Sequence, residues 1–175
     1  MTLECVDVGV RLGDRVLLQA FSASFQPGRL TAILGPNGVG KSTLLALLSG
    51  QRRPDSGSVL LDGRPLTGYS AQTLALRRAV MPQESAVAFD FSVREVADLG
   101  RYPHRHSPDV DESGVVNRAL EATDVAALAP RIFNTLSGGE KSRVHLARAL
   151  AQVWARRPDA AACWLLLDEP TAALD

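Results

Sequence analysis

The residues best suited to chemistry are a lysine and two hydroxyls that follow three closely spaced glycines. The run Gly35-Pro36-Asn37-Gly38-Val39-Gly40-Lys41-Ser42-Thr43 fits the pattern G-x-x-x-x-G-K-[ST] at every fixed position. Its glycines allow backbone conformations that a Cβ would forbid, so successive N–H groups can surround an anion. Lys41 could then reach the β- and γ-phosphates of a nucleotide, and the Ser42 hydroxyl could bind Mg²⁺. We therefore predict a phosphate-binding loop, in preference to an ordinary glycine-rich turn before a helix.

The segments on either side of this loop have the character that it requires. The apolar run Leu30–Leu34 predicts a strand that enters the loop, and the apolar run 44–48 predicts a helix that leaves it and ends at Gly50. The N-terminus of that helix would point its free N–H groups and the positive end of its dipole at the phosphates.

Two adjacent carboxylates form a second candidate group. Asp168 and Glu169 follow the continuous apolar run 164–167, which predicts a buried parallel strand. Ligands of open α/β sheets bind beyond the carboxyl ends of the strands. There Asp168 could help to hold Mg²⁺, and Glu169 could orient a water molecule for attack on the γ-phosphate. Alone, the pair could equally be a solvated strand end, but the phosphate loop favours the catalytic interpretation.

Composition limits the remaining possibilities. The 175 residues are 46% hydrophobic and 22% charged with no net charge, which is typical of a globular domain and gives no reason to expect nucleic acid as a partner. The distant Cys5 and Cys163 match no metal-ligand spacing and favour a reducing compartment. The N-terminus lacks the pattern of a signal peptide, and no apolar run is long enough to cross a bilayer, so a membrane role would depend on a partner.

The order of the other segments predicts an α/β fold. Strands at 3–10 and 16–25, joined by a turn at Gly13-Asp14, predict an antiparallel hairpin. Further strands are expected at 58–61 and 79–81, and a helix at 71–78. The stretch 84–131 predicts a helical insertion, with helices opening near Ser92 and Ser113. We expect a polar loop over Gly100–Pro108, and a long helix that begins after Ser137.

The start of that long helix carries a specific resemblance. A capping box explains Ser137 and Glu140 of Leu136-Ser137-Gly138-Gly139-Glu140, but it gives no reason for Gly138 and Gly139. The whole segment resembles the signature of the ATP-binding cassette (ABC) ATPases. The resemblance implies that this helix N-terminus contacts the γ-phosphate of ATP held by a second ATP-binding subunit, in a head-to-tail dimer.

Other roles and the architecture are implied by the same resemblance. Gln83 matches the Q-loop glutamine, which contacts Mg²⁺ and the attacking water. Asp168 and Glu169 match the Walker B metal ligand and catalytic base, and Asp175 closes a D-loop match. The family's fold is a P-loop NTPase (RecA-like) core with an N-terminal antiparallel β subdomain and an inserted α-helical subdomain, here a single domain 1–175 with the helical part at about 84–155.

Several stretches resemble one group within this family. The segments at 78–83, 91–96 and 99–104 are similar to the iron-chelate uptake group, and those at 146–154 and 164–171 to the ATP-binding subunits of bacterial heme importers. This implies ATP hydrolysis at the cytoplasmic face of the inner membrane, with integral permease subunits as partners and a periplasmic substrate-binding protein as an indirect one. His104 and His106 are then expected in a solvated loop facing the membrane partner rather than as heme ligands, and His145 is expected on the surface or partly packed.

Two departures from the family pattern stand out. Leu12 occupies the place of the aromatic residue that usually stacks on adenine, so apolar contact would replace stacking. The chain stops at Asp175, before the family's switch histidine and the next strand of the sheet, which would lie between the strands that precede the phosphate loop and Asp168. We therefore expect a truncated form, lacking the C-terminal part of the core, that folds poorly alone and hydrolyses ATP weakly or not at all. Turnover at a rate typical of the family would contradict that hypothesis.

Alternatives remain open. The cargo could be another iron chelate, a siderophore or cobalamin. The chain could be an ABC protein that works without membrane subunits, although such proteins usually carry two cassettes and one phosphate loop is present here. It could also be a nucleotide-binding fragment without ATPase activity. A P-loop kinase would not need the segment Ser137-Gly138-Gly139.

Overall fold

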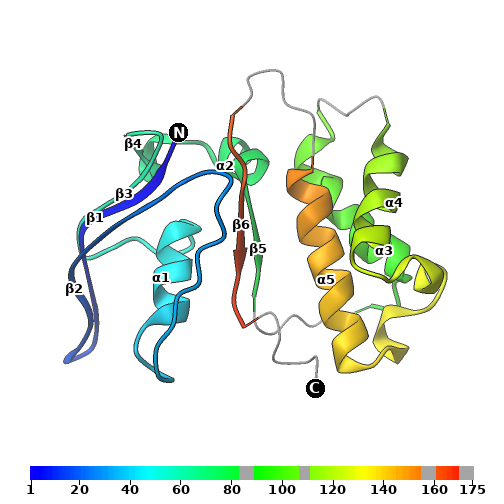
Figure 1. Ribbon diagram of the computed structural model, residues 1–175, viewed down its shortest axis with the longest axis horizontal. Coiled ribbons are helices and arrows are strands. Elements are labelled where there is room, and N and C mark those ends of the chain that lie inside the picture. The colour runs from blue at the N-terminus through cyan, green and yellow to red at the C-terminus, as the bar shows by residue number, and fades with distance from the viewer. Residues whose placement is uncertain (83–88, 107–110, 155–160, 170–175) are drawn as a thin grey trace. The chain divides into compact units, whose positions relative to one another are not determined.

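The computed structural model describes residues 1–82, 89–106, 111–154 and 161–169 (Figure 1). Its contacts divide the chain into two compact units, Met1–Leu74 and Ala75–Asp175, which are described separately below. The boundary falls within helix α2 (Ala71–Arg77).

The first unit is built on a four-stranded antiparallel sheet. Its strands are β1 (Leu3–Leu12), β2 (Arg15–Phe25), β3 (Ser56–Leu61) and β4 (Arg64–Pro65), in the order β2-β1-β3-β4. The predicted hairpin is confirmed, since β1 and β2 pair antiparallel across the turn at Gly13-Asp14. The short strand β4, followed by the 3₁₀ turn η1 (Leu66–Gly68), was not predicted from the sequence.

Alternation along β1 supplies the core of this unit. The buried residues are first the odd-numbered Leu3 and Cys5 and then the even-numbered Val8 and Val10. This change of face coincides with an irregular pairing register between β1 and its neighbours. Helix α1 (Lys41–Leu48) lies beside this sheet and buries its leucines 44, 47 and 48 (Figure 1). The helix that was predicted to follow the phosphate loop is therefore confirmed.

The expected strand at Leu30–Leu34 is the main error in the prediction. These residues form no strand, and no described strand pairs with them. Leu30 is 98% exposed and Leu34 is 89% exposed. Apolar composition favours a strand, but a strand exists only where a neighbour satisfies its N–H and C=O groups. Among the described residues this segment has no such neighbour.

The second unit contains a short parallel sheet. Strands β5 (Arg78–Met81) and β6 (Trp164–Leu167) pair in parallel, as the apolar run before Asp168 predicted. Of the residues in β6 only Leu166 is fully buried, while the other three are half-buried. The side chain of Gln152 donates to the carbonyl oxygens of Ala75 and Arg78 at 2.8 and 2.9 Å, which ties the start of β5 to the end of α5 (Gly138–Val153).

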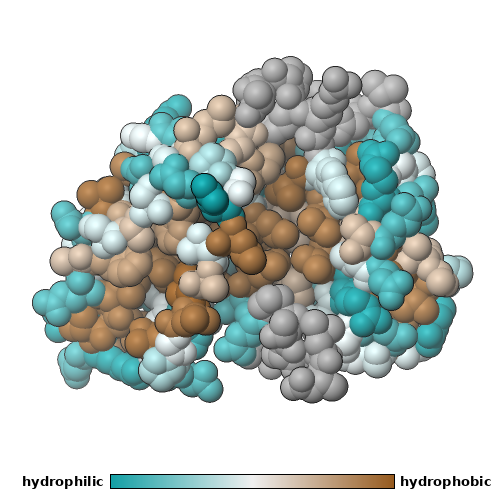
Figure 2. Space-filling model, in the orientation of Figure 1, coloured by the Kyte–Doolittle hydropathy of each residue, from teal (hydrophilic) through white to brown (hydrophobic). Residues whose placement is uncertain are grey.

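Helices α3 (Val93–Asp98), α4 (Glu112–Ala122) and α5 enclose a separate apolar core in this unit. The 3₁₀ turns η3 (Ala126–Leu128) and η4 (Phe133–Thr135) connect α4 to α5. Helix α4 turns Val115, Val116, Ala119 and Leu120 inward, and Figure 2 shows hydrophilic side chains over its outer face. The helix predicted to open near Ser92 is confirmed, and it begins with a capping box in which Ser92 and Glu95 bond to each other's backbone N–H groups.

The polar loop expected at Gly100–Pro108 is wrong in its described part. Residues Leu99–His104 form a 3₁₀ helix, η2, that packs against the C-terminal end of α5. Arg101 is buried, with Nε and Nη2 donating to Glu112 at 2.6 and 2.8 Å and Nη1 donating to the Ala151 carbonyl oxygen at 2.7 Å. The polar residues of this segment are thus internal bonding partners, a role that composition alone does not distinguish from exposure.

Candidate functional site

The glycine-rich loop leads directly into α1 with a backbone that needs glycine. Gly40 is the residue before the helix and has φ 109°, a left-handed conformation that residues with a Cβ rarely adopt. No side chain caps this helix, and its first turn holds no acidic residue. The N–H groups that begin α1 are therefore unoccupied by a side-chain acceptor, which is the arrangement that binds an anion.

Lys41 bends back over the loop that precedes it. Its Nζ donates to the carbonyl oxygens of Gly35 and Pro36 at 2.9 and 3.2 Å. Ser42, the next residue, is exposed in the first turn of α1. The structure thus brings together the predicted loop residues: a cation, an exposed hydroxyl and the start of a helix within one segment.

The end of the β1–β2 hairpin lies against the same loop. Leu12 and Arg15 face each other across the turn, and Arg15 Nη2 donates to the carbonyl oxygen of Gly38 at 2.9 Å. A Cβ on Gly40 would lie 3.4 Å from the carbonyl oxygen of Leu17. Leu12 is 62% exposed. Sequence reasoning missed Arg15, because an arginine after a turn carries no signal of its own until the hairpin register places it beside the loop.

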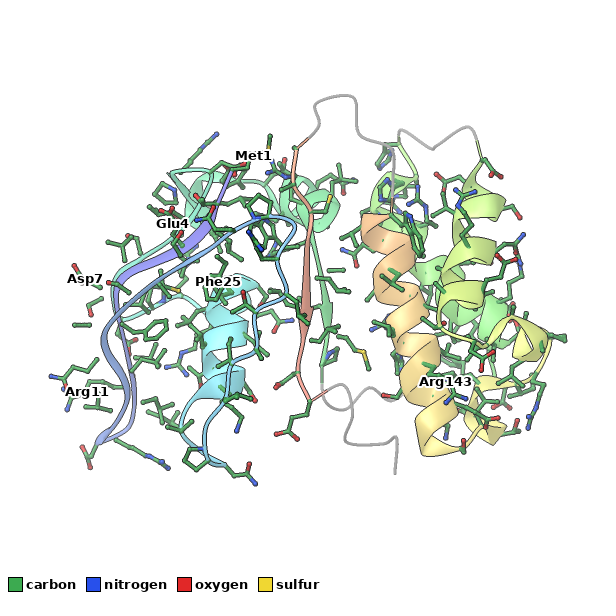
Figure 3. The ribbon with its side chains drawn as sticks, in the orientation of Figure 1. Met1, Glu4, Asp7, Arg11, Phe25 and Arg143 are labelled. Atoms are coloured by element: carbon green, nitrogen blue, oxygen red, sulfur yellow. The ribbon has the colours of Figure 1, made fainter. Side chains whose placement is uncertain are left out.

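The segment Ser137-Gly138-Gly139-Glu140 forms the N-terminus of α5 as a complete capping box. The Ser137 N–H donates to Glu140 Oε2 at 2.8 Å, and the Glu140 N–H donates to Ser137 Oγ at 3.3 Å. The Ser137 N–H and, next, the Ser137 hydroxyl both donate to the Glu140 carboxylate and lower its pKa, and Arg131 and Arg143 act in the same direction. Figure 3 shows Arg143 projecting from α5. Gly138 is exposed, so the cap leaves the start of the helix open to solvent.

Asp168 and Glu169 lie immediately after β6, as the sequence predicted. The Asp168 N–H donates to the Met81 carbonyl oxygen at 3.0 Å and so extends the pairing of β5 with β6 by one residue. Glu169 is exposed and has φ 46°, a left-handed conformation that costs free energy for a residue with a side chain. Such a conformation at a carboxylate is a reason to look for function there. Gln83 and Asp175, the two other predicted contacts, lie outside the described residues.

The oxygen donors suit magnesium. Mg²⁺ is normally bound by one or two protein oxygens together with phosphates and water. The Ser42 hydroxyl and the Asp168 carboxylate are hard oxygen donors of that kind. Among the described residues, no group of three or more His, Cys, Asp or Glu side chains is arranged to hold a metal ion by itself. Each of these two oxygens, taken by itself, is therefore of the kind that binds an ion shared with phosphate.

Two of the three histidines differ from the expectation for them. His104 is buried, and its Nε2 lies 2.8 Å from the carbonyl oxygen of Gln152. Because a carbonyl oxygen only accepts, Nε2 must carry the proton that it donates. His145 is buried with its ring edge-on to Phe133 at 5.0 Å, rather than lying on the surface or being only partly packed. His106 is exposed, as expected.

Comparison with known proteins identifies the family. The model of the ABC transporter family matches residues 18–172, a span that contains both the phosphate loop and the Asp168-Glu169 pair. The chain belongs to the ABC transporter family. The predicted fold class is confirmed, since the antiparallel N-terminal strands and the α/β arrangement are those of this P-loop ATPase domain.

Individual relatives narrow the comparison. The hemin import ATP-binding protein HmuV of Gloeobacter violaceus is 48% identical over 174 residues, which are 99% of this chain and 63% of that protein. The protein of the same name from Escherichia coli O157:H7 is 48% identical over 167 residues, which are 95% of this chain and 61% of that protein. The chain thus spans less than two thirds of the length of these curated relatives.

Two solved structures have a similar fold. One is described as a metal-chelate type ABC transporter in an inward-facing conformation. It is 31% identical, has a TM-score of 0.77 and is matched over 99% of this chain and 62% of its own. The other is a bacterial Atm1-family ABC exporter with ATP bound. It is 28% identical, with a TM-score of 0.81 over 99% of this chain and 30% of its own.

Membrane-spanning helices were also sought. In the part of the chain that the structure describes, none of the helices combines the length and the apolar character needed to cross a bilayer.

Proposed function

We propose that this chain binds and hydrolyses ATP as part of an ABC importer that takes up heme across the cytoplasmic membrane. The observation that carries the proposal is the phosphate loop. Its left-handed Gly40, the uncapped N-terminus of α1 and Lys41 form a site for phosphates within one segment. The similarity to hemin import ATP-binding proteins over nearly the whole chain supports heme as the cargo.

In this proposal each residue has a defined task. Lys41 exchanges its bonds to the Gly35 and Pro36 carbonyl oxygens for bonds to the β- and γ-phosphates, so charge that accumulates on the phosphates is neutralised. Ser42, Asp168 and Gln83 would hold Mg²⁺, which when bound spreads the phosphate charge. Glu169 accepts a proton from the attacking water and orients it in line with the γ-phosphate.

The partners follow from the same family. We propose that a second ATP-binding subunit docks head to tail, so that Ser137, Gly138, Gly139 and Glu140 meet the nucleotide of the opposite subunit and Asp175 lies at the dimer interface. Integral permease subunits would bind this chain at the cytoplasmic face of the inner membrane, and a periplasmic binding protein would act indirectly. The open N-terminus of α5 supports the first of these contacts.

Substitutions at two positions test the enzymatic part. Lys41→Met should abolish ATP binding, whereas Glu169→Gln should retain binding and stop turnover. Equilibrium binding and phosphate release would be measured for the chain and for its complex with the permease subunits. Unchanged hydrolysis by Glu169→Gln in that complex would exclude Glu169 as the base. Growth on heme, siderophores or cobalamin as the only source, after deletion of the gene, would separate the possible cargoes.

A second candidate is a nucleotide-binding fragment without turnover. The observation that favours it is the segment Leu30–Leu34, which precedes the phosphate loop without a pairing strand among the described residues. A loop without that support can bind phosphates but holds them with less precision, and phosphoryl transfer depends on positioning. ATP binding by the chain alone with no phosphate release would support this candidate.

A further inference from the structure

We infer that Gln152 is a positioning residue for ATP hydrolysis. Its side-chain amide fixes where α5 lies along β5, and so fixes the start of α5 relative to the Asp168-Glu169 pair that follows β6. The inference rests on the proposed function, in which the start of α5 serves the nucleotide of the opposite subunit, while Asp168 and Glu169 serve the nucleotide of their own. Gln152 is given no contact with ATP and acts only through these elements.

The apolar contact between α5 and β5 is small. Ala149 is the α5 residue that is fully buried in this cluster, together with Ala79 and Met81 of β5, while Leu146 and Val153 are only partly buried there. Apolar contacts are not directional, and the side chain of alanine is too short to interlock with its neighbours. This packing therefore holds α5 against the sheet without fixing its position along the strand.

The opposite side of α5 is held by a larger core. Val144, Ala147 and Ala151 are fully buried in the cluster that α5 shares with α3 and α4. Close-packed cores of this kind resist sliding, because every side chain is surrounded by others. Helix α5 should therefore move together with α3 and α4, and the contact that can adjust is the one with β5.

The Gln152 amide supplies the direction that the apolar contact lacks. Its Nε2 donates to the carbonyl oxygens of Ala75 and Arg78 at 2.8 and 2.9 Å, so each acceptor can take one of its two hydrogens. Ala75 lies in the last turn of α2, where carbonyl oxygens have no N–H of their own helix to accept from. Arg78 is the first residue of β5. Two directional bonds to neighbouring peptide groups fix both the distance and the orientation of the amide.

The backbone at Gln152 is held as well. Its carbonyl oxygen accepts from His104 Nε2 at 2.8 Å, and the carbonyl oxygen of Ala151 accepts from Arg101 Nη1 at 2.7 Å. The backbone of Gln152 is thus bonded to η2 while its side chain is bonded to α2 and β5. Helix α5 cannot shift along β5 without stretching the bonds of Gln152.

Such a shift would separate two groups that the proposed reaction uses. The end of α5 is bonded to the start of β5, so the helix and the strand run in opposite directions, and β6 runs parallel to β5. The start of α5 and the carboxyl end of β6 therefore lie toward the same edge of this unit (Figure 1). In a head-to-tail pair both groups must fit their nucleotides at once, and a displacement of about 1 Å can lower a rate about 100-fold.

The test separates catalysis from nucleotide binding. Gln152→Met keeps the length of the side chain and removes both donors. In the complex with the permease subunits it should lower kcat for ATP hydrolysis at least about tenfold. Equilibrium binding of ATP should stay within about twofold of the original, because the phosphate loop belongs to the other unit.

Two further variants separate positioning from stability. Gln152→Lys keeps hydrogen-bond donors at this position and should recover most of the lost kcat. Val116→Ala removes two methyl groups from the core of α3, α4 and α5, where Val116 is 1% exposed, and leaves the contact between α5 and β5 intact. It should lower the urea midpoint at least as much as Gln152→Met does, with kcat unchanged. If Gln152→Met does not fold, Gln152→Asn replaces it, since its shorter side chain draws the amide away from both acceptors.

The outcomes are distinct. If the kcat of Gln152→Met fell no further than that of Val116→Ala, or if Gln152→Lys were as slow as Gln152→Met, the role of Gln152 would be overturned while the proposed function stood. ATP binding that weakened in proportion to kcat would indicate a general structural role and would also overturn it. If the original complex did not bind and hydrolyse ATP, the proposed function would fail, and the role of Gln152 with it. A lower kcat at unchanged ATP binding, recovered by Gln152→Lys, supports both.

Discussion

Replacing Arg101 by methionine should destabilise the second unit far more than replacing any exposed arginine. The charge-assisted hydrogen bonds of Arg101 include two to Glu112 and one to the Ala151 carbonyl oxygen. Methionine fills a similar volume but donates no hydrogen bond. The substitution would therefore remove the charged donor of a buried carbonyl oxygen and the ion pair between Arg101 and Glu112.

The magnitude can be estimated from the exposure of each partner. The bond to the Ala151 carbonyl oxygen is buried, and a hydrogen bond to a charged group contributes about 1.5–3 kcal/mol. The Glu112 side chain is 33% exposed, so water compensates for part of its loss and the ion pair adds only about 1 kcal/mol. We therefore expect Arg101→Met to lower the free energy of unfolding of this unit by about 3 kcal/mol.

Urea unfolding followed by tryptophan fluorescence is a suitable assay. The two tryptophans of the chain, Trp154 and Trp164, both belong to the second unit, so their emission reports on that unit. With a denaturant slope of about 2 kcal/mol/M, the midpoint should fall by about 1.5 M. The slope should stay unchanged, because the substitution does not alter the surface exposed on unfolding.

Arg118→Met is the matched control. Arg118 pairs with Asp111 at 3.3 Å, but both side chains are more than half exposed, so the change should stay within about 0.5 kcal/mol. Glu112→Gln keeps an acceptor for Arg101 and should lie between the two. If the midpoint of Arg101→Met moved no further than that of Arg118→Met, the argument that Arg101 stabilises this unit would be refuted.

Three further predictions concern single sites. Glu140→Gln should make the stability depend less on pH below pH 4.5. The pKa of Glu140 is lowered in the folded chain, so its carboxylate contributes its full stabilisation above pH 4.5 and loses it as the pH falls through the pKa of the folded state. Urea midpoints between pH 3 and pH 6 would measure this. At pH 8, iodoacetamide should modify Cys163 long before Cys5, because burial raises the pKa of the Cys5 thiol to about 11; mass spectrometry would locate the label. Gly100→Ala should lower the urea midpoint by about 0.5–1.5 M, since the added Cβ would overlap the Arg148 carbonyl oxygen.

Each of these has a contradicting result. If the Glu140→Gln variant lost stability in acid as much as the original chain, the capping box of α5 would not be the cause of that loss. Glu95→Gln, in the equivalent capping box of α3, is the control that shows how much another cap contributes to the same pH dependence. Equal labelling of both cysteines in the folded chain would mean that Cys5 is accessible, while urea should make them equally reactive. An unchanged midpoint for Gly100→Ala would show that η2 can move away from α5.

The features predicted correctly from the sequence are those that depend on residues close together along the chain. The phosphate loop and both capping boxes depend on residues three to six positions apart, so their types and spacing determine the geometry. The hairpin was predictable for the same reason, since a turn of two residues sets the pairing of the strands that it joins.

The predictions that failed concern residues whose bonding partners lie far away in the sequence. Leu30–Leu34 has the composition of a strand, but pairing is decided by whichever segment lies beside it. Arg101 reads as a solvated residue in a polar loop, yet one of its acceptors is 11 residues away and another is 50. Arg15 gave no signal for a similar reason, because its acceptor in the phosphate loop lies 23 residues further on.

The hydrogen bonds at the C-terminal end of α5 affect how this helix could move. Arg101 and His104 of η2 donate hydrogen bonds to the carbonyl oxygens of Ala151 and Gln152, and the Gln152 side chain donates to carbonyl oxygens at and just before the start of β5. The 16 residues of α5 make a rod about 24 Å long whose other end is the Ser137 cap. Because η2 is bonded to one end of this rod, we expect a displacement of η2 to shift the Ser137 end of α5 as well.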